Sequence, residues 1–486
     1  MNTIKRYLKN SPIIVTYAFI AVGIITFLVV AIPRFLYPYE LLWMEGSILD
    51  QLWRIMANKP LYCKPSIEYV PWLYQPFYYY LTSAFTSITG LSFITARIPS
   101  VVSTIAICTI LYKIVRKETN SLHYAVVAVG LFIGAYGKIG YCLEAARVDT
   151  LFAALLLVSL VTIYYCKSTL GLLLGVLALI LSYFTKQTAV LFAPGIILYL
   201  IVARGWKVSL VFSAIFSLLI LVGTFSLDSM YNGWYHYYAI LIPQAKRKTL
   251  RWDFAIDGFI VYILLRCWLT TALLSIPALR YFVKGIRKRE ENFIGYIALF
   301  FTAGLGAGFV GILNEGGAHN VLLPAAIGCA IFLPVAVNQL AKNKKYATPA
   351  KWLIPIQLLF LLSNPFSDPR NLAKEADRVN QEEFLASIAP LQGEVWIPYH
   401  GFMPRSVGKQ TYAELRAFGD VLLVGDSVAR QLQADLDTAL SKRHWSYILD
   451  DFEDTFPGYR LLEEKTNLNK PHVSDETTIF VFVPQK

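Results

Sequence analysis

The chain has 486 residues, of which 56% are hydrophobic and only 16% are charged. Soluble globular proteins carry about 25% charged residues, so this composition and a mean hydropathy of +0.51 exclude an ordinary soluble protein. They indicate a polytopic α-helical membrane protein. The net charge of +12 does not indicate a nucleic-acid partner, because the lysines and arginines cluster in short segments between apolar runs, as the positive-inside rule expects.

The N-terminal segment is basic and precedes the first long apolar run, Ser11 to Leu36. This run is long enough to cross a hydrocarbon core about 30 Å thick. It lacks a small-residue cleavage site, so we interpret it as a retained first helix rather than a signal peptide. Lys5, Arg6 and Lys9 then predict a cytoplasmic N-terminus.

Residues 37–73 form the first predicted external loop. Their pattern predicts an amphipathic helix lying on the membrane surface, with Asp50, Gln51 and Arg54 away from the apolar face. That face is formed by Leu42, Leu49, Leu52, Trp53 and Met56.

Residues 74–90, YQPFYYYLTSAFTSITG, are short and rich in Ser, Thr and Tyr. If they cross the membrane, the basic segment 113–120 lies outside; if they only dip into the interface, it lies inside. We adopt the dipping interpretation, because the basic ends of the later segments then fall inside. This predicts about eleven transmembrane helices, near residues 12–36, 94–115, 122–139, 150–166, 169–185, 188–203, 209–226, 256–283, 293–312, 322–340 and 352–363.

Beyond Pro365 the composition becomes polar with mixed charge. We therefore predict a transmembrane domain over residues 1–363 and a small external α/β domain over residues 364–486. In the second domain, NLAKEADRVNQEEFLASI and ARQLQADLDTALSKR predict helices, whereas EVWIP, WSYIL and TIFVFVP predict strands.

Under this topology the unusual polar side chains gather on the external side. Ionisable residues at membrane depth are costly and indicate function by default, so we predict that residues from five segments converge at one site. They are Glu40, Glu45, Glu144, Arg147, Asp149, Lys186, Gln187, Lys246, Arg247, Arg251, His319 and Asn320.

Several of these residues also have a structural interpretation. Glu40 could stabilise the start of the amphipathic helix through the helix dipole, and Glu45 could be a solvated residue of that helix. Arg147 and Asp149 could form a structural ion pair. Lys186 could reach the interface, but its apolar surroundings, SYFTKQTAV, predict a charged partner.

Two further segments keep two interpretations each. The basic cluster AKRKTLR (245–251) could be solvated, but positive charge outside opposes the positive-inside rule and favours a phosphate or anionic lipid partner. The glycines of NEGGAHN (314–320) fit either a tight turn or the close approach of the backbone to a ligand.

The order of these motifs resembles the GT-C superfamily of glycosyltransferases, which take sugars from polyprenyl-phosphate donors. An acidic residue in the first external loop is the hallmark of that superfamily, and Glu40 in PYELLWMEG occupies its place. The segment YVPWLYQPFYYYLTSAF…GLSFITARIPS resembles the family's PPLYY…G…ARLPS segment, which includes juxtamembrane helices. EAARVDTLF resembles the R-x-D motif of the second loop. TKQ, GGAHN and YHGFMPRSVGKQTY are similar to a bacterial branch with an external C-terminal domain.

The resemblance implies roles for the predicted site residues. Positive charge would stabilise the phosphate leaving group, with Lys186 and Arg147 as candidates and the cluster 246–251 in reserve. Glu40 would be the base that accepts the proton of the acceptor hydroxyl, with a pKa raised by its apolar neighbours. Asp149 would orient the acceptor or assist as a second acid, and the remaining predicted site residues would bind substrate. One base acting directly on the acceptor implies a single inverting displacement.

No cofactor is implied. The first loop has no DxD motif and the chain has no CxxC pair, so the sequence shows no sign of a metal site. Some superfamily members use a divalent ion, so metal dependence stays open. Cys63 and Cys142 both fall in predicted external segments, where a disulfide is possible, but two unpaired thiols is the state we favour. The expected partners are an undecaprenyl-phosphate sugar, a lipid-linked glycan acceptor and membrane lipid.

The expected location is the bacterial inner membrane, with the C-terminal domain in the periplasm. We expect a hexose, glucose, to be added to O-antigen, because the resemblance extends to phage-type serotype-converting O-antigen glucosyltransferases. Lipid A and protein stay open as acceptors. A flippase for lipid-linked sugars and a polysaccharide polymerase or ligase stay open as functions. A flippase would predict charged or broken helices at the bilayer midplane and two related halves, and neither is visible.

Overall fold

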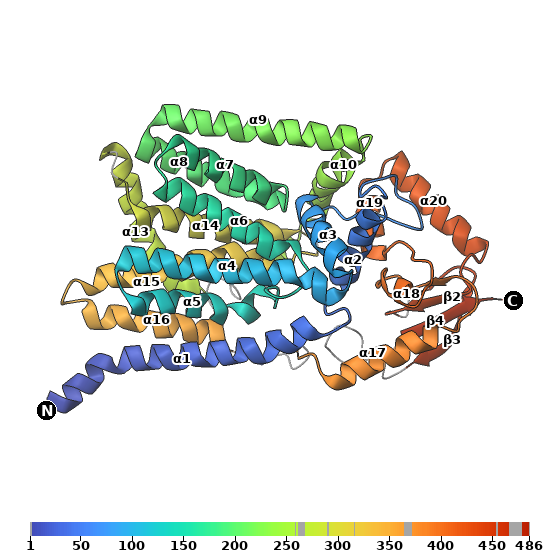
Figure 1. Ribbon diagram of the computed structural model, residues 1–486, viewed down its shortest axis with the longest axis horizontal. Coiled ribbons are helices and arrows are strands. Elements are labelled where there is room, and N and C mark those ends of the chain that lie inside the picture. Colours follow the sequence, from blue (N-terminus) through green and yellow to red (C-terminus); the bar gives the residue numbers. More distant parts are fainter. Residues whose placement is uncertain are drawn as a thin grey trace.

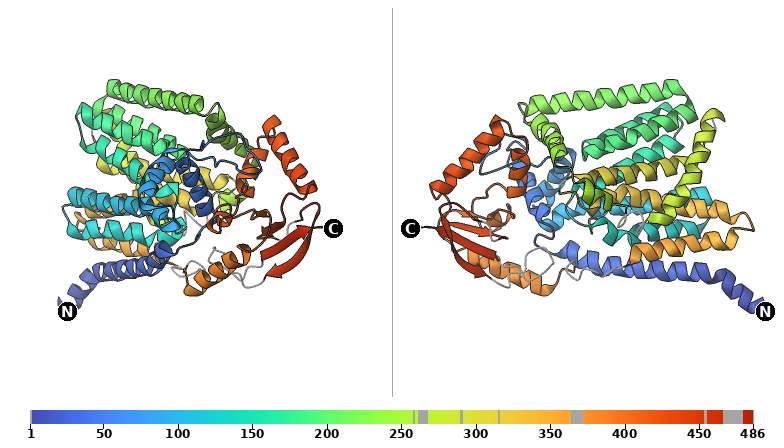
Figure 2. Two further views of the ribbon diagram at one scale, coloured as in Figure 1. Left: turned by 45° about the vertical axis from the view of Figure 1, so that its right-hand side comes forward. Right: turned by 180° about the vertical axis from the view of Figure 1, so that it is seen from behind.

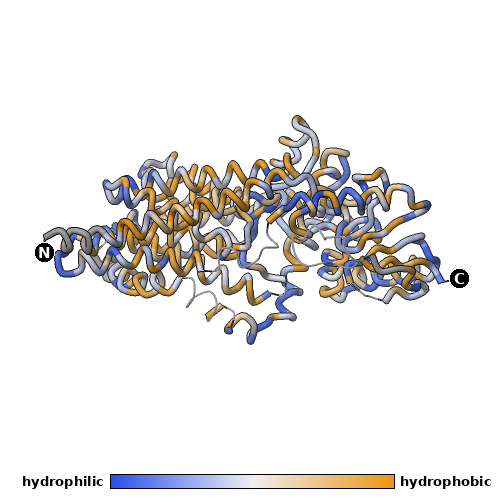
Figure 3. The backbone as a smooth tube through the Cα atoms, turned by 90° about the horizontal axis from the view of Figure 1, so that it is seen from below, coloured by the Kyte–Doolittle hydropathy of each residue, from blue (hydrophilic) through white to orange (hydrophobic). Residues whose placement is uncertain are grey.

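A helical bundle and a smaller domain with a β-sheet lie at opposite ends of an elongated molecule (Figures 1 and 2). The computed structural model describes residues 2–257, 259–260, 268–288, 291–314, 316–363, 372–452, 455–465 and 479–485. Apolar residues dominate the bundle, whereas the C-terminal domain is of mixed character (Figure 3). The N-terminus and the C-terminal domain lie at opposite ends of the bundle (Figure 1).

The long helices of the bundle run alongside one another. They are α1 (Asn2–Leu36), α4 (Phe93–Thr119), α5 (Leu122–Gly134), α6 (Val148–Tyr165), α7 (Thr169–Tyr183), α8 (Ala193–Arg204), α9 (Trp206–Met230), α13 (Leu269–Lys288), α14 (Phe293–Leu313), α15 (Leu323–Ala341) and α16 (Ala347–Leu362). In the described part of the chain, 7 segments are long and apolar enough to cross a membrane, and the helices within 122–134, 169–183, 269–283 and 347–362 are apolar but shorter.

Burial separates central from peripheral helices. In the segment His319–Ala341, which includes α15, 94% of the apolar window is buried, against 17% for α9. Helix α15 is therefore the centre of the bundle, and α9 exposes an apolar face, including Leu218 and Leu221, that suits lipid chains.

Each predicted transmembrane segment corresponds to a helix in the described part of the chain, but several ends differ. The predicted helix 122–139 ends at Gly134 and continues as the 3₁₀ turn η1 (Tyr136–Ile139). The first part of the predicted helix 256–283 contains residues 258 and 261–267, which lie outside the described residues. Two predicted helices start with 3₁₀ turns, η2 (Gln187–Phe192) and η6 (His319–Leu322), and a proline near the start of α8 and of α15 then begins the regular helix.

Helix α3 (Phe77–Thr89) has 13 residues. At about 1.5 Å per residue it spans about 20 Å, less than the ~30 Å hydrocarbon core. Its length agrees with the dipping interpretation of residues 74–90.

The amphipathic helix expected in the first loop is present as α2 (Trp43–Met56). Its position on the membrane surface stays a prediction, but the helix is covered by protein on more than one side. Residues on both sides of the helix are buried, including Leu49, Leu52 and the polar Gln51. The reason is that α3 and the C-terminal domain both cover α2, with Ala417, Phe418 and other residues sharing its apolar core.

The remaining elements between α9 and α13 are short: α10 (Trp234–His236), η3 (Tyr237–Leu241), α11 (Ile242–Ala245), η4 (Lys246–Thr249) and α12 (Trp252–Ile256). They continue from α9 towards the junction with the C-terminal domain, where Tyr237 Oη donates to Asp426 Oδ1 at 3.2 Å. Cys63 and Cys142 are free thiols, in agreement with the favoured state.

The C-terminal domain contains a four-stranded sheet in the order β1-β2-β4-β3. Strands β1 and β2 are parallel, and β4 pairs antiparallel with β2 and β3. The elements are α17 (Glu375–Ile388), β1 (Val395–Trp396), α18 (Met403–Ser406), α19 (Leu415–Leu422), α20 (Ser427–Ser441), β2 (Tyr447–Asp450), β3 (Tyr459–Lys465) and β4 (Ile479–Pro484). The domain boundary predicted after residue 363 falls next to residues 364–371, which lie outside the described residues, so it stays a prediction.

The predicted helices and strands of this domain correspond to α17, α20, β1, β2 and β4. Strand β3 was missed because its sequence, YRLLEEK, is highly charged. A charged strand is stable at the edge of a sheet, and that is where β3 lies.

Candidate functional site

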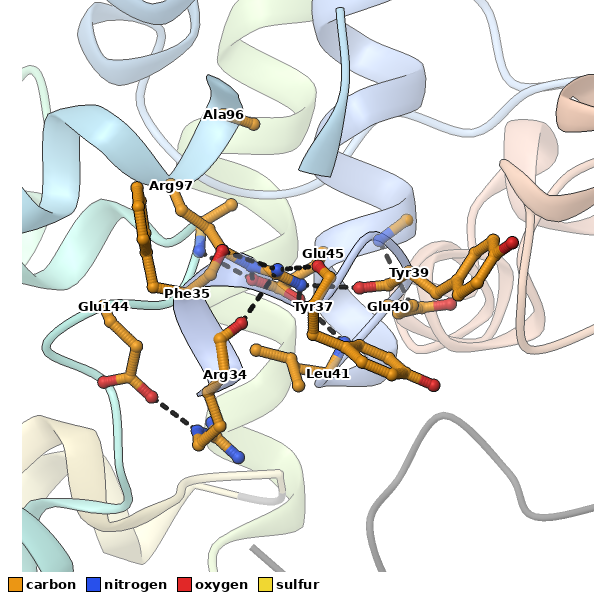
Figure 4. Close-up of polar contacts among 12 residues, drawn as sticks. Arg34, Phe35, Tyr37, Tyr39, Glu40, Leu41, Glu45, Ala96, Arg97 and Glu144 are labelled. Carbon is orange, nitrogen blue, oxygen red and sulfur yellow. Dashed lines mark hydrogen bonds and ion pairs between the residues drawn. The ribbon is translucent and has the colours of Figure 1, made fainter. Parts of the chain in front are cut away.

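Arg97 organises the first external loop. Its helix, α4, starts with a capping box between Ser92 and Thr95, which sets the guanidinium one turn into the helix. The guanidinium donates to both carboxylate oxygens of Glu45, at 2.9 and 2.7 Å. It also donates to the backbone carbonyls of Arg34 at 3.0 Å, Tyr37 and Tyr39 (Figure 4). The chain after α1 therefore wraps around one buried cation.

Glu45 is fully enclosed, with 0% of its surface exposed, so its interpretation as a solvated residue is wrong. Besides Arg97, the backbone N–H groups of Leu41 and Ala146 donate to it, both at 2.8 Å. Burial alone would raise its pKa, but Arg97 and these donors outweigh burial and lower the pKa of Glu45. This carboxylate favours its charged form and joins the first loop to the second.

Glu40 lies five residues earlier and has different partners. It is 2% exposed. The N–H of Gly46 donates to its Oε1 at 3.1 Å, and Nδ1 of His400 lies 2.9 Å from its Oε2. A Cβ at position 46 would lie 3.1 Å from Glu40 Oε1, so the close approach favours glycine there.

His400 belongs to the C-terminal domain and lies between two carboxylates. Its Nε2 is 3.2 Å from Oδ2 of Asp451, which follows β2. Burial alone would lower the pKa of His400, but the charges of Asp451 and Glu40 outweigh it and raise the pKa well above its ordinary value. Burial raises the pKa of Glu40, although His400 opposes the shift. The raised pKa expected for Glu40 is thus confirmed, and both imidazole nitrogens act as donors.

Besides Glu40 and Asp451, a further acid, Glu414, lies at the same junction. Ser47 Oγ donates to Glu414 Oε2, and both side chains are buried. Burial, together with the nearby charge of Glu40, raises the pKa of Glu414 well above its ordinary value. The junction therefore concentrates carboxyl groups whose pKa is raised, a feature common at functional sites.

A second cluster lies at the ends of three bundle segments. Asp149, in the first turn of α6, accepts from Lys186 at 2.6 Å, from Asn320 at 2.8 Å and from Arg147 at 3.1 Å. Asp149, Lys186 and Asn320 are buried. The motifs R-x-D, TKQ and GGAHN thus meet at one carboxylate, and the charged partner expected for Lys186 is confirmed. Two cations held by one acid could bind a phosphate.

The two clusters are adjacent through the backbone. Glu45 accepts from the N–H of Ala146, which directly precedes Arg147 of the second cluster. On the other side of Glu45, Gly46 donates to Glu40. The start of α2 therefore fixes the position of Glu40 relative to the Asp149 cluster.

Glu144 makes an ion pair with Arg34 of α1 and accepts from Tyr136 Oη at 2.6 Å. Both charged side chains are buried, and Arg34 Nη2 also donates to the carbonyl of Tyr141 at 3.3 Å. This pair ties α1 to the second loop. Substrate binding by Glu144 stays a prediction.

The other predicted site residues differ in their surroundings. Lys246 makes an ion pair with Asp420 of α19 at 2.7 Å, so part of the basic cluster holds the C-terminal domain. Arg247 and Arg251 are exposed. His319 is exposed beside Asn320, and the buried Oε1 of Gln187 has no hydrogen-bond partner among the described residues.

Comparisons with known proteins bear on the family and on the fold. Residues 70–227 match the family model described as dolichyl-phosphate-mannose-protein mannosyltransferase. The apo crystal structure of ArnT from Cupriavidus metallidurans superposes with a TM-score of 0.55 at 11% identity, covering 96% of this chain and 97% of that chain. The likeness to ArnT shows that this chain has the GT-C fold, and residues 70–227 resemble the mannosyltransferase family. The predicted fold is thereby confirmed.

The undecaprenyl-phosphate-bound crystal structure of the same ArnT gives a TM-score of 0.51 at 10% identity, with the same coverage of 96% and 97%. At this identity the likeness to ArnT shows the fold alone. No curated protein sequence matches the chain significantly.

Sequence reasoning missed the partners that distinguish the acids of this site. Arg97 lies in ARIPS and His400 in YHGFMPR, two segments that carry the family resemblance. The sequence shows both residues but not their partners. His400 and Glu40, for example, are 360 positions apart. Asp451 had no local signal. Among the described residues, no group of three or more His, Cys, Asp or Glu side chains is arranged to hold a metal ion.

Proposed function

We propose that this protein is a glycosyltransferase that transfers a hexose, glucose, from an undecaprenyl-phosphate carrier to a hydroxyl of a lipid-linked glycan such as an O-antigen repeat. The reaction would take place on the periplasmic side of the bacterial inner membrane. The observation that carries the proposal is the buried Glu40, at the place of the superfamily's acid, hydrogen-bonded to His400. The ArnT structure bound to undecaprenyl phosphate supports a carrier of this kind.

In the proposed reaction Glu40 accepts the proton of the acceptor hydroxyl while that oxygen attacks the anomeric carbon of the sugar. Its raised pKa makes Glu40 a stronger base than an ordinary carboxylate. His400 and Gly46 hold the carboxylate in place, and each carboxylate oxygen keeps a lone pair for the hydroxyl.

The bond between the anomeric carbon and the phosphate oxygen breaks as the new bond forms, so the configuration inverts. The departing phosphate takes up negative charge and needs fixed cations. Lys186 and Arg147 supply them, and Asp149 with Asn320 keeps the ammonium oriented. Asp149 is therefore assigned to the phosphate side in this scheme.

The test uses the purified protein in nanodiscs with labelled undecaprenyl-phosphate glucose and a lipid-linked O-antigen repeat. We expect labelled product whose new linkage has the anomeric configuration opposite to that of the donor, determined by NMR. Retention of configuration would overturn the single displacement. Translocation of the donor in proteoliposomes without a new glycosidic bond would instead support a flippase.

Mass spectrometry of surface glycans from cells with and without the gene identifies the sugar and the acceptor together. A change in O-antigen supports the proposed acceptor. A change confined to lipid A or to a protein would replace that acceptor while leaving the chemistry of Glu40 in place.

A further inference from the structure

A pocket of about 180 Å³ lies between the C-terminal half of α2, the loop that follows it and the C-terminal domain. None of the residues assigned above to the proposed chemistry lines it. Its walls include Asp50 and Trp53 of α2, and Arg405 and Thr411 of the C-terminal domain. The pocket therefore exists only while the two domains are docked.

Two arginines are held rigidly in its walls. The guanidinium of Arg405 stacks 3.4 Å from the ring centre of Trp53 and donates to Asp50 at 3.3 Å and to Thr411 at 2.7 Å. The guanidinium of Arg54 stacks 3.7 Å from the ring centre of Tyr69. Stacking fixes the direction of the N–H groups before any ligand arrives, which reduces the entropic cost of binding.

The pocket has unused hydrogen-bonding capacity. At the rim, the exposed Lys59, Glu68 and Gln410 add an ammonium, a carboxylate and an amide. Donors and acceptors thus surround one small space.

This chemistry selects among possible ligands. The stacked arginines cover the aromatic faces, which disfavours an apolar ligand. The lining holds the cations Arg54, Lys59 and Arg405 beside the carboxylates Asp50 and Glu68. This near balance of charge gives a phosphate dianion no large excess of positive charge to bind. The volume is below the roughly 300–1,000 Å³ of pockets for drug-sized ligands, so one small ring fits. A neutral ring with many hydroxyl groups uses both the donors and the acceptors.

The pocket also lies close to the proposed base. Asp50 and Arg54 follow Gly46 along α2 by about one and two turns, or roughly 6 and 12 Å, and Gly46 donates to Glu40. We propose that this pocket binds one sugar ring of the acceptor glycan and thereby directs a neighbouring hydroxyl towards Glu40. The assignment rests on the proposed function, since it names the acceptor subsite of that reaction.

The test measures binding and transfer separately. The probe is the delipidated O-antigen repeat oligosaccharide, and its binding to the full-length protein in nanodiscs is measured by saturation-transfer NMR. The rim variant K59A/E68Q/Q410A removes exposed side chains and should fold normally. Losing two to three hydrogen bonds should weaken binding at least tenfold. K64A, an exposed lysine of the same loop that does not line the pocket, should bind like the wild type.

Equal binding by the rim variant and the wild type, or no binding by the wild type, would overturn the pocket assignment. Displacement of the oligosaccharide by inorganic phosphate would also overturn it, in favour of an anion site. A wild type that binds the probe but transfers no sugar to a lipid-linked acceptor would leave the pocket in place and defeat the proposed function.

Discussion

The helical bundle and the junction with the C-terminal domain both bury carboxylates, but they pair them with different partners. In the bundle and the loops attached to it, Glu45 pairs with Arg97 and Asp149 with Lys186. At the junction, Glu40 pairs with His400. The two glutamates are five positions apart in one loop.

The difference lies in what the partner can do. An arginine does not lose its proton in proteins, so Glu45 stays ionised, and its pKa is lowered. A histidine can lose its proton, unlike an arginine, and the pKa of Glu40 is raised because burial outweighs the effect of His400. The first pairing stabilises structure, whereas the second suits proton transfer. The comparison teaches that the partner, rather than burial, decides the role of an acid.

The largest effect should come from Glu40→Gln. It keeps the size of the side chain and removes the base, so we expect transfer to fall by about 10²–10⁴-fold, with the thermal unfolding midpoint little changed. The measurement is sugar transfer from a labelled donor. Glu383→Gln, at an exposed position of α17, is the matched control. Undiminished transfer by Glu40→Gln would remove the proposed base.

Arg97→Met should break the structural pairing. It leaves Glu45 charged, buried and unpaired, so we expect a loss of about 3–5 kcal/mol in unfolding free energy. The measurement is unfolding in detergent. The double variant Arg97→Met/Glu45→Leu should recover most of the loss, since it removes both charges. A single variant as stable as Arg430→Met, an exposed control, would contradict the structural role of Arg97.

His400→Gln should weaken docking of the C-terminal domain in a pH-dependent way. Because the pKa of His400 is raised above 6.5, the stabilisation from its protonation is complete below about pH 6.5 and is lost as pH rises through the raised pKa. The variant should lack this dependence and transfer sugar about tenfold more slowly, because Glu40 loses a positioning contact.

The measurement for His400→Gln is the thermal unfolding midpoint from pH 6 to pH 9. The matched control is His444→Gln, at an exposed histidine of the same domain. If His400→Gln kept the pH dependence of the wild type, the imidazolium between Glu40 and Asp451 would be ruled out.

The smallest effect should come from Lys246→Ala. Its ion pair with Asp420 crosses the junction, but both side chains keep some solvent contact, at 18% and 14% exposure. Ion pairs near the surface contribute about 0–1 kcal/mol, so we expect a slight fall in the thermal midpoint relative to the exposed control Lys442→Ala. A fall as large as that of Arg97→Met would mean that the basic cluster is central to docking.

The sequence by itself determined the helical bundle, the short α3 and the α/β character of the C-terminal domain. Each depends on apolar periodicity, turn residues and helix ends, which are properties of neighbours in the chain. It also predicted that residues 147–149, 185–187 and 316–320 lie at the same side of the membrane, because the basic segments assign the sidedness of the helices.

Only the tertiary structure decided which charge meets which. The pairing of Glu45 with Arg97 and the contact of Glu40 with His400 join residues 52 and 360 positions apart. The burial of α2 under the C-terminal domain joins residues as far apart as Ser47 and Glu414, 367 positions. A carboxylate carries no local sign of its partner, because Coulomb and hydrogen-bond energies depend on distance in space. The roles of two glutamates in one loop were therefore fixed by packing that no local pattern records.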